Sequence, residues 1–455
     1  MSHPVDSEAA IDHAGVPASL AAGAVRPGDP DYARLRSNYL RAGSPGLVLR
    51  PGSPDEVVDA IGFARRHRHL PLGVRSGGHG VSGRSTNRGG LVIDLGTMNG
   101  VEVLDEATRL VRVGPGARWK DVARALDPYD WALGSGDYGG VGVGGLATAG
   151  GIGLLARKHG LTIDHLRAVE LVLADGTRLR ASATENPDLF WAVRGAGANF
   201  GIATAFEFEV SEVAEVGWAQ LALAVPDLEH ALLQYAEAAA AAPRDTTVFL
   251  VTGRPHGAQA VLQLFGMVDA ADPDVIVDRL GPFAALGALV QQQVVVTRYA
   301  DVMGLAADVG PEGHRAIGEP ASRSAFAPRF TPELAADTAR LLESGAVFFY
   351  EIRPMGGAIA DVPPEETAFT YRSPAAQITA LGATQAALDA AWDPLRRHYD
   401  GLYLSFDTDL RPERLRDAFP PAALRRLRTL KRRYDPDNLF RDNFNIAPEE
   451  EDLHD

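Results

Sequence analysis

One histidine of this chain lies in a glycine-rich turn, Val74–Gly80, with the sequence Val-Arg-Ser-Gly-Gly-His-Gly. The apolar run Leu72–Arg75 predicts a strand that leads into this turn. Adjacent glycines let backbone N–H groups converge on an anion without interference from Cβ atoms, as in the nests that bind pyrophosphate. The imidazole of His79 would then lie beside the bound ligand. A second interpretation stays open, a tight turn in which the histidine is incidental, because single histidines are common in loops.

A second glycine-rich segment covers residues 134–153. Gly140, Gly142 and Gly145 have the spacing of the dinucleotide-binding fingerprint. This match is weak, because the segment lies well inside the chain without a convincing strand–helix–strand unit around it, so we reject a Rossmann site. The segment is also too poor in side chains to form ordinary core. Its bare backbone can instead pass directly beside a flat, wide ligand.

Three other polar groupings imitate metal or charge-binding sites. His67 and His69 lie at a predicted helix end without partner ligands, which favours a solvated surface over a metal. Residues 435–438 imitate the start of a calcium loop but lack its glycine and its closing glutamate. The basic run 425–433 is most simply an exposed helix face. The chain has no cysteine, which excludes disulfides, thiolate nucleophiles and cysteine metal sites, and we expect no metal.

Length and composition narrow the class of protein. At 455 residues, 46% of them hydrophobic and 23% charged, the chain should form two closely packed units of mixed α and β structure. Its net charge of −15 repels phosphate backbones and anionic lipid, so nucleic acid and membrane are not expected as partners. No apolar run approaches the roughly 18 residues that cross a bilayer. The start lacks the basic region of a signal peptide, and we expect a cytoplasmic protein.

Hydrophobic periodicity and turn signals predict the elements that must position these motifs. Ser53 as N-cap and Pro54 at the first helical position begin a helix that runs to about His67. Asp175-Gly176 is a strong hairpin signal between two strands. The strands predicted in the first half are 47–50, 72–75, 91–95, 101–104, 110–113, 169–174, 177–180 and 202–210. Beyond a boundary near residues 211–217 the predicted strands are 219–225, 248–252, 260–264, 347–353 and 402–406, and the predicted helices are 228–241, 272–286, 332–342 and 383–398.

Two further motifs complete a family pattern. Residues 185–202 read Glu-Asn-Pro-Asp-Leu-Phe-Trp-Ala-Val-Arg-Gly-Ala-Gly-Ala-Asn-Phe-Gly-Ile, and residues 434–440 read Tyr-Asp-Pro-Asp-Asn-Leu-Phe, with Asn443 and Ile446 beyond them. Together with the glycine-rich segments they closely resemble the berberine bridge enzyme-like FAD-linked oxidases, of the vanillyl-alcohol oxidase / p-cresol methylhydroxylase superfamily. The resemblance covers roughly residues 31–446.

The resemblance implies an α+β fold, with a two-part FAD-binding domain of vanillyl-alcohol oxidase type and a substrate domain whose antiparallel sheet is covered by helices. The expected organisation is a flexible arm at 1–30, an FAD-binding domain at 31–213, a substrate-binding domain at 214–410 and a C-terminal return to the FAD domain at 411–455.

The resemblance also implies a covalent flavin on His79. A bond from the flavin 8α carbon to the imidazole locks the ring in place and is expected to raise its potential. Many relatives add a second link from a cysteine, and Tyr138 stands at the aligned position here, so attachment can only be through His79. Val141 stands where relatives carry a residue that gates oxygen access, and valine resembles the oxygen-reactive members. The other implied cofactor-binding residues are Arg75, Ser76, Gly77, Gly78, Gly80, Gly144, Gly145, Gly150, His159, Gly197, Asn199, Gly201, Ile202 and Asn443.

On the substrate side, the resemblance marks Glu351 as a substrate-contacting acid and Ser405 as the replacement of an amide that contacts substrate. In a strand at 402–406, Tyr403 and Ser405 would share one face. Tyr403 is the candidate general base or substrate anchor, and Tyr138 completes the candidate catalytic residues. A tyrosine base needs nearby positive charge because its ordinary pKa is about 10, and Arg353 is one source. The alternative is that Tyr403 is a core aromatic.

The expected activity is that of an oxidase. Hydride would pass to flavin N5 from a C–H next to the oxygen or nitrogen of a small organic or natural-product substrate, and O2 would be reduced to H2O2. A dehydrogenase that needs another electron acceptor stays open as an alternative. So does a flavin-binding protein without turnover, to which Ser405 gives some weight. The substrate itself does not follow from the sequence, because one fold hosts many functions.

Overall fold

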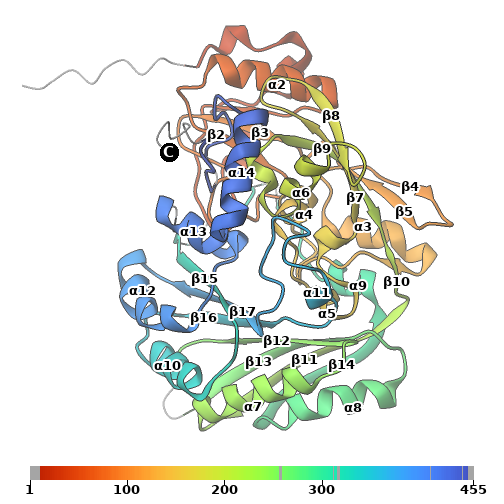
Figure 1. Ribbon diagram of the computed structural model, residues 1–455, viewed down its shortest axis with the longest axis vertical. Coiled ribbons are helices and arrows are strands. Elements are labelled where there is room, and N and C mark those ends of the chain that lie inside the picture. Colours follow the sequence, from red (N-terminus) through yellow and green to blue (C-terminus); the bar gives the residue numbers. More distant parts are fainter. Residues whose placement is uncertain are drawn as a thin grey trace, which may run out of the picture.

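The computed structural model describes residues 11–255, 259–310, 312–314, 318–409, 411–442 and 444–448. These residues form two bodies that lie against each other (Figure 1). The upper body in Figure 1 contains a three-stranded and a five-stranded sheet, and the lower body is built on a seven-stranded sheet. The combination of separate helices with mainly antiparallel sheets confirms the expected α+β class.

A small parallel sheet with the strand order β1-β3-β2 begins the upper body. Its strands are β1 (Leu47–Leu49), β3 (Leu91–Asp94) and β2 (Leu72–Arg75). Helix α2 (Pro54–Arg66) buries its apolar stripe in the same hydrophobic cluster as these strands. Its start is as predicted, because the Ser53 hydroxyl accepts a hydrogen bond from the Glu56 amide (3.3 Å) and Pro54 opens the helix. Strand β2 then leads straight into the glycine-rich turn.

An antiparallel sheet completes the upper body, with the order β4-β5-β9-β7-β8. Its strands are β4 (Val101–Asp105), β5 (Leu110–Val113), β9 (Ile202–Glu209), β7 (Leu166–Val172) and β8 (Arg178–Ser182). The predicted strands of the first half are all present, and the hairpin at Asp175-Gly176 joins β7 to β8. These strands pack with helix α3 (Trp119–Leu126) and helix α6 (Pro187–Ala196) in one core.

The second glycine-rich segment contains a helix that the sequence did not predict. Helix α4 (Val143–Ala149) buries Val143 and Ala147 in the core of the upper body. Glycine disfavours a helix interior by about 1 kcal/mol relative to alanine. Tertiary burial of one face overrides that preference here, so the segment contributes to the core as well as to the surface of a cavity.

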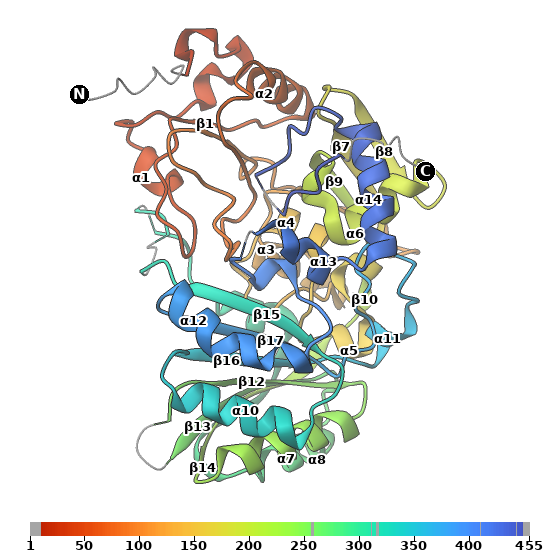
Figure 2. The same cartoon turned by 60° about the vertical axis from the view of Figure 1, so that its left-hand side comes forward.

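The lower body is one antiparallel sheet with the order β14-β11-β13-β12-β16-β17-β15. Its strands are β11 (Glu215–Val225), β12 (Thr246–Thr252), β13 (Ala260–Val268), β14 (Ala288–Arg298), β15 (Ala321–Ala327), β16 (Phe349–Pro354) and β17 (Ala376–Gly382). Helices α7 (Leu228–Ala241), α8 (Pro273–Ala284), α10 (Pro332–Glu343) and α12 (Gln385–Trp392) cover one face (Figures 1 and 2). On the opposite face, Trp218, Phe249 and Met267 pack with Leu154 and Leu155 of the upper body. Among the helices of the described residues, none combines the length and apolar character needed to cross a bilayer.

Three strands of this sheet, β14, β15 and β17, were not predicted. Strand β15 reads Ala-Ser-Arg-Ser-Ala-Phe-Ala and β14 contains three consecutive glutamines, so neither shows the apolar alternation of a half-buried strand. Residues 402–406 are predicted to form a strand that is absent from the structure, because Leu404–Phe406 forms a short 3₁₀ turn. The predicted strand is therefore wrong, and the cause is described with the site.

The chain returns to the upper body through helix α14 (Pro421–Tyr434), which packs on α6. The interpretation of its basic run as an exposed face is wrong for Lys431, which is fully buried and forms an ion pair with Asp435 (2.7 Å). The Lys431 ammonium also donates to the carbonyls of Asn199 (2.8 Å) and Phe440 (3.0 Å). A buried charge needs such partners, and these bonds tie the C-terminal segment to the turn around Asn199.

Replacing Lys431 by methionine is expected to lower the free energy of unfolding by about 3–5 kcal/mol, because the carboxylate of Asp435 would remain buried and unpaired. Urea denaturation of the variant and the wild type measures the difference. The matched control is Lys158→Met, since Lys158 is partly exposed in its ion pair with Asp269 and should cost at most about 1 kcal/mol. Equal losses in the two variants would contradict the buried-charge argument.

The described part of the N-terminal segment, residues 11–30, lies on the upper body. Leu20 is buried in the same cluster as α2, and Val25 forms a β-bridge with Val48. His67 also differs from its interpretation as a solvated side chain. It is buried, its Nε2 accepts a hydrogen bond from the Asp12 amide (3.2 Å), and its Nδ1 is 3.0 Å from the carbonyl of Phe63. Its role is therefore to fasten this segment to the end of α2.

Candidate active site

A large cavity lies where the two bodies meet and encloses about 1800 Å³ of space, its open mouth included. Four chain segments that are far apart in sequence line it, together with single side chains such as Arg353. The segments are the glycine turn 76–80, residues 136–149, residues 195–203 and residues 403–406. The cavity thus brings together both glycine-rich segments, the 185–202 motif and the candidate substrate residues.

The two glycine-rich segments touch through their backbones. A Cβ atom at Gly77 would overlap the backbone nitrogen of Gly142, and a Cβ atom at Gly142 would overlap that of Gly77. The Arg118 guanidinium fastens them together by donating to the carbonyls of Gly77 (2.5 Å) and Gly140 (2.7 Å). Only glycine permits this approach, so one wall of the cavity is bare backbone.

The cavity wall fits the phosphates and ring of a bound dinucleotide. Gly80 and Gly145 both line the cavity, and a Cβ atom at either would have no heavy atom within 4 Å. A ligand can therefore approach the backbone directly at these positions. Arg84 adds positive charge to the same wall, although burial lowers its pKa to about 9 against the opposing effect of two acids.

His79 lines both this cavity and a second one that opens beside it. The imidazole stacks on Tyr39, with ring centroids 5.1 Å apart, and lies near the rings of Tyr138 (5.5 Å) and His314 (4.8 Å). Burial, together with the neighbouring charges of His314 and Arg118, lowers the pKa of His79 to about 3. The imidazole is therefore neutral near pH 7, with a nitrogen lone pair available for bond formation.

Arg353 provides a charge on the substrate side of the cavity. It pairs with Glu351 (2.9 Å) and Asp137 (3.1 Å), and its guanidinium lies 4.8 Å from the ring centroids of Phe249 and Phe406. Burial disfavours the charged guanidinium, but the two acids outweigh this effect and raise its pKa. Burial raises the pKa of Glu351, and Arg353 opposes that shift. The carboxylate of Glu351 is directed at Arg353 and does not line the cavity.

Tyr403 lines the cavity, and its hydroxyl accepts a hydrogen bond from the Gly151 amide (3.0 Å). Burial raises its pKa, while the Ser405 side chain, the Gly151 amide and the charge of Arg353 act in the opposite direction. The net direction keeps the phenol protonated near pH 7. This environment favours an anchoring or donating hydroxyl over a general base.

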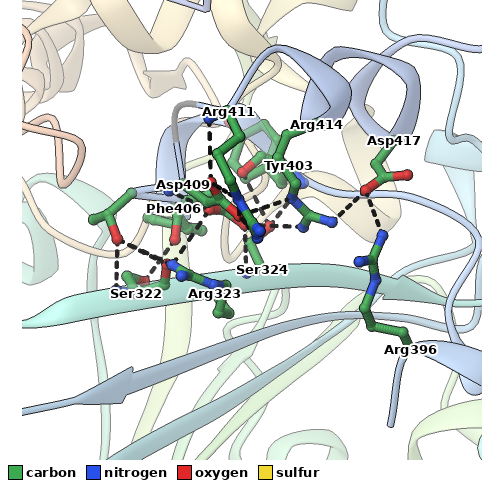
Figure 3. A network of polar contacts seen from close by, with 12 residues as sticks. Ser322, Arg323, Ser324, Arg396, Tyr403, Phe406, Asp409, Arg411, Arg414 and Asp417 are labelled. Carbon is green, nitrogen blue, oxygen red and sulfur yellow. Dashed lines mark hydrogen bonds and ion pairs between the residues drawn. The ribbon is translucent and has the colours of Figure 1, made fainter. Parts of the chain in front are cut away.

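The turn after Tyr403 replaces the predicted strand and changes which side chains reach the cavity. Residues 403, 404, 405 and 406 all line it, whereas a strand would direct alternate side chains away. Two serines of the edge strand β15 hold this turn by their side chains (Figure 3). The Ser324 hydroxyl accepts from the Tyr403 amide (2.7 Å) and donates to the Tyr403 carbonyl (3.0 Å), and the Ser322 hydroxyl donates to the Phe406 carbonyl (2.6 Å).

A network of buried charged side chains lies next to these two serines. Asp407 is fully buried between the guanidinium groups of Arg323 (3.8 Å) and Arg414 (3.5 Å), and it accepts a hydrogen bond from the Ser324 amide (3.2 Å). Arg414 also reaches Asp409 (3.5 Å), so the network continues into the C-terminal return (Figure 3). The position of Tyr403 thus depends on residues from β15 and from the chain beyond the turn.

Replacing Ser324 by alanine is expected to accelerate hydrogen exchange at the Tyr403 amide by about 5–30-fold, because the loss of bonds worth about 1 kcal/mol each favours local opening. The Gly151 amide should exchange faster as well, since its acceptor is the Tyr403 hydroxyl. Exchange followed by mass spectrometry on peptides around both residues gives the measurement. Thr338→Val is the control, because this substitution removes a buried hydroxyl that contacts the Tyr350 hydroxyl (3.2 Å), away from the turn. Unchanged protection in Ser324→Ala would contradict the clamp.

Most of the residues marked in the sequence meet at this cavity. Those that line it are Ser76, Gly77, Gly78, His79, Gly80, Val141, Gly144, Gly145, Gly197, Asn199, Gly201, Ile202, Tyr403 and Ser405. Tyr138 lines the second cavity, beside His79. Asn443 lies outside the described residues.

Three expected cofactor residues lie elsewhere. Arg75 points away from the cavity into an ion pair with Asp94 (2.6 Å). His159 was expected beside the flavin, but its Nε2 is 2.7 Å from Asp269 of the lower body. Gly150 does not line the cavity, and a Cβ atom there would press against the rings of Phe369 and Tyr403. Arg75 and His159 each pair with a carboxylate that is distant in sequence, Asp94 and Asp269 respectively, and this pairing sets the direction of the side chain.

Several site residues were missed by sequence reasoning. Arg118, His314 and Ser324 lie outside the glycine-rich and terminal motifs, and each reaches the site through tertiary contacts. His314 is 3.2 Å from the Gly77 carbonyl through its Nε2. No local pattern distinguishes these residues from ordinary surface or core positions, so only the fold could reveal them.

The fold and the cavity define an FAD-dependent oxidoreductase. A sequence model of the FAD binding domain matches residues 45–182, and a model described as berberine and berberine like matches residues 412–447. The chain thus contains an FAD-binding segment and a berberine-like C-terminal segment, and the resemblance noted in the sequence is confirmed.

Three relatives show the extent of the similarity. (R)-6-hydroxynicotine oxidase from Paenarthrobacter nicotinovorans is 29% identical over 89% of this chain and 92% of its own length. The crystal structure of 6-hydroxy-D-nicotine oxidase from Arthrobacter nicotinovorans superposes with a TM-score of 0.80 at 27% identity, covering 94% of this chain and 98% of that chain. The glucooligosaccharide oxidase from Acremonium strictum, which carries a 6-S-cysteinyl, 8α-N1-histidyl FAD, has a TM-score of 0.81 at 22% identity, covering 95% and 99%, and supports the fold alone.

Proposed function

We propose that this oxidase holds its FAD by one covalent bond, between the flavin 8α carbon and His79, and oxidises a C–H bond next to oxygen or nitrogen in a small organic substrate. The observation that carries the proposal is the neutral, low-pKa imidazole of His79 in the cavity wall. The chain contains no cysteine, so the cysteinyl link of the Acremonium strictum enzyme has no counterpart here. Tyr138, next to His79, would occupy that place.

The cofactor would lie along the glycine wall. We assign its diphosphate and ring to the turn Ser76–Gly80, to Gly144 and Gly145, and to the segment from Gly197 to Ile202, with Asn443 at the C-terminal end. When bound, the flavin would supply two-electron redox chemistry, with the substrate as hydride donor and O2 as the final acceptor, giving H2O2. Val141, which lines the cavity, is the proposed control on oxygen access.

On the domain organisation, we assign residues 31–213 and 411–455 to the FAD-binding domain and residues 214–410 to the substrate-binding domain. The ion pair of Lys431 with Asp435 and the bond from Lys431 to Asn199 support the return of the C-terminal segment to the FAD side. The cavity between the two bodies is then the place where a substrate meets the cofactor.

The chain's own residues would orient the substrate. Tyr403 is the proposed anchor, because its phenol is protonated near pH 7 and its position is held by Ser324. Ser405 presents a second hydroxyl from the same turn, and Arg353 presents a positive charge balanced by Glu351 and Asp137. A substrate with a hydroxyl, carbonyl or amine nitrogen next to the reacting carbon would find hydrogen-bond partners in this wall.

The test begins with the flavin itself. Precipitation of the holoprotein with trichloroacetic acid should leave the yellow chromophore in the pellet, and a peptide containing His79 should carry the mass of FAD. A colourless pellet would overturn the covalent attachment.

An anaerobic panel of alcohols and amines should identify compounds that bleach the flavin. Reoxidation in air by stopped flow then separates an oxidase from a dehydrogenase that needs another acceptor. A flavin that resists every reductant of the panel would favour a flavin-binding protein without turnover.

A further inference from the structure

The strand at one edge of the seven-stranded sheet is unusually exposed and apolar. Strand β14 pairs only with β11, and the described residues contain no strand on its other side. It is 11 residues long, and positions 288–296 are all exposed. Five of its large apolar side chains are between 38% and 67% exposed, namely Leu289, Val290, Val294, Val295 and Val296. They make up a large part of the exposed apolar side chains of the described chain.

Monomeric proteins protect such edges. A long edge strand presents unpaired N–H and C=O groups, and lysine, proline, a bulge or a short strand usually prevents another strand from adding to it. Strand β14 has neither lysine nor proline, and it carries no charged residue from Ala288 to Thr297. A single bulge leaves Val290 without a partner on β11, and the ladder is regular from Gln291 to Arg298. The edge is therefore open to an extended partner.

The order of residues in β14 identifies that partner as a second copy of the chain. Around Gln292, the sequence Leu-Val-Gln-Gln-Gln-Val-Val is nearly the same in both directions. An antiparallel pair with its two-fold axis at Gln292 sets glutamine opposite glutamine and valine opposite valine. A two-fold interface uses one surface twice and must be complementary to itself, and this strand meets that condition.

Charge and area agree with self-association. Two chains of net charge −15 repel each other, and an uncharged edge is where they can approach without placing like charges together. Arg298, the charge that ends the strand, already pairs with Asp127 (2.8 Å) and Asp130 (2.7 Å). A stable interface buries about 800 Å² on each partner. The strand is about 37 Å long, so a band of surface about 20 Å wide along it provides that area. Helix α8, which packs on β11 and β13 beside the edge, can contribute to the band (Figure 1).

We infer that β14 is a homodimer interface, in which two copies join their seven-stranded sheets into one continuous antiparallel sheet around Gln292. This inference is independent of the flavin chemistry, since β14 does not line the cavity. The interface would protect the edge from indiscriminate strand addition.

The test uses the absence of cysteine from the chain. The Gln292→Cys holoprotein should form an intermolecular disulfide under mild oxidation, because paired residues at the axis have Cα atoms about 4.5–5.5 Å apart, within the range that a disulfide spans. Gln263→Cys is the matched control and should stay uncross-linked. Gln263 is also exposed, but it lies on the interior strand β13, which pairs with β11 on one side and β12 on the other.

Light scattering after gel filtration gives the second measurement. The wild-type holoprotein should have twice the mass of one chain, and Gln292→Lys should have the mass of one, with unchanged flavin absorbance. Gln263→Lys should remain dimeric. A wild type that is monomeric at every concentration up to its solubility limit would overturn the inference. So would a dimer that survives Gln292→Lys and fails to cross-link, or a monomer that binds lipid vesicles through this edge.

Discussion

Replacing His79 by alanine is expected to give a protein whose flavin is bound only reversibly. The imidazole is the one group of the described wall that we assign to the covalent bond, and its low pKa keeps it neutral and nucleophilic. The intact mass should fall to that of the polypeptide, and acid precipitation should release the chromophore into the supernatant. Turnover should fall by about tenfold or more, which corresponds to about 1.4 kcal/mol or more of activation free energy.

The matched control for this experiment is His159→Ala. His159 is also a partly buried histidine near the junction of the bodies, but it is bonded to Asp269 and does not line the cavity. This variant should keep its covalent flavin in full. A flavin adduct that persists in His79→Ala would show that another side chain forms the bond, and the proposed attachment would have to be abandoned.

Replacing Tyr403 by phenylalanine is expected to reduce kcat/KM by about 10-fold to 100-fold for any substrate that the panel identifies. The phenol would no longer anchor the substrate, at a cost of about 1–3 kcal/mol, and the Gly151 amide would lose its acceptor. Steady-state kinetics of the variant and the wild type measure the change. Covalent flavin content should remain complete, because Tyr403 is not part of the attachment site.

The pH profile distinguishes an anchor from a base. Since burial raises the pKa of Tyr403 above its ordinary value, an anchoring phenol stays protonated and should add no ionisation to kcat/KM below about pH 10. A general base would instead give activity that rises with pH up to its own pKa, and its removal would cost about 10²–10⁴ in kcat. An ionisation near neutral pH that disappears in Tyr403→Phe would overturn the anchoring role. Phe406→Leu, in the same turn, controls for changes in packing.

Local signals in the sequence determined much of the upper body. The cap of α2 at Ser53 and Pro54 and the hairpin at Asp175-Gly176 depend on residues within a few positions of each other. The glycine turn with His79 is of the same kind, because its backbone requirements and its imidazole lie in one segment. Short-range preferences of this kind are visible in a single sequence, and the family resemblance rested on several such segments in order.

Tertiary structure alone decided the substrate side of the site. Residues 402–406 have the composition of a strand, and the hydroxyls of Ser322 and Ser324, about eighty positions away, bind their backbone and favour the turn. Arg75, His159 and Lys431 likewise took their positions partly from partners far away in sequence, namely Asp94, Asp269 and the Asn199 carbonyl. A polar side chain in the interior goes where its charge or hydrogen bond can be satisfied. That partner is chosen by the packing of the whole chain, which is why the glycine wall could be predicted and the conformation of the turn at residues 403–406 could not.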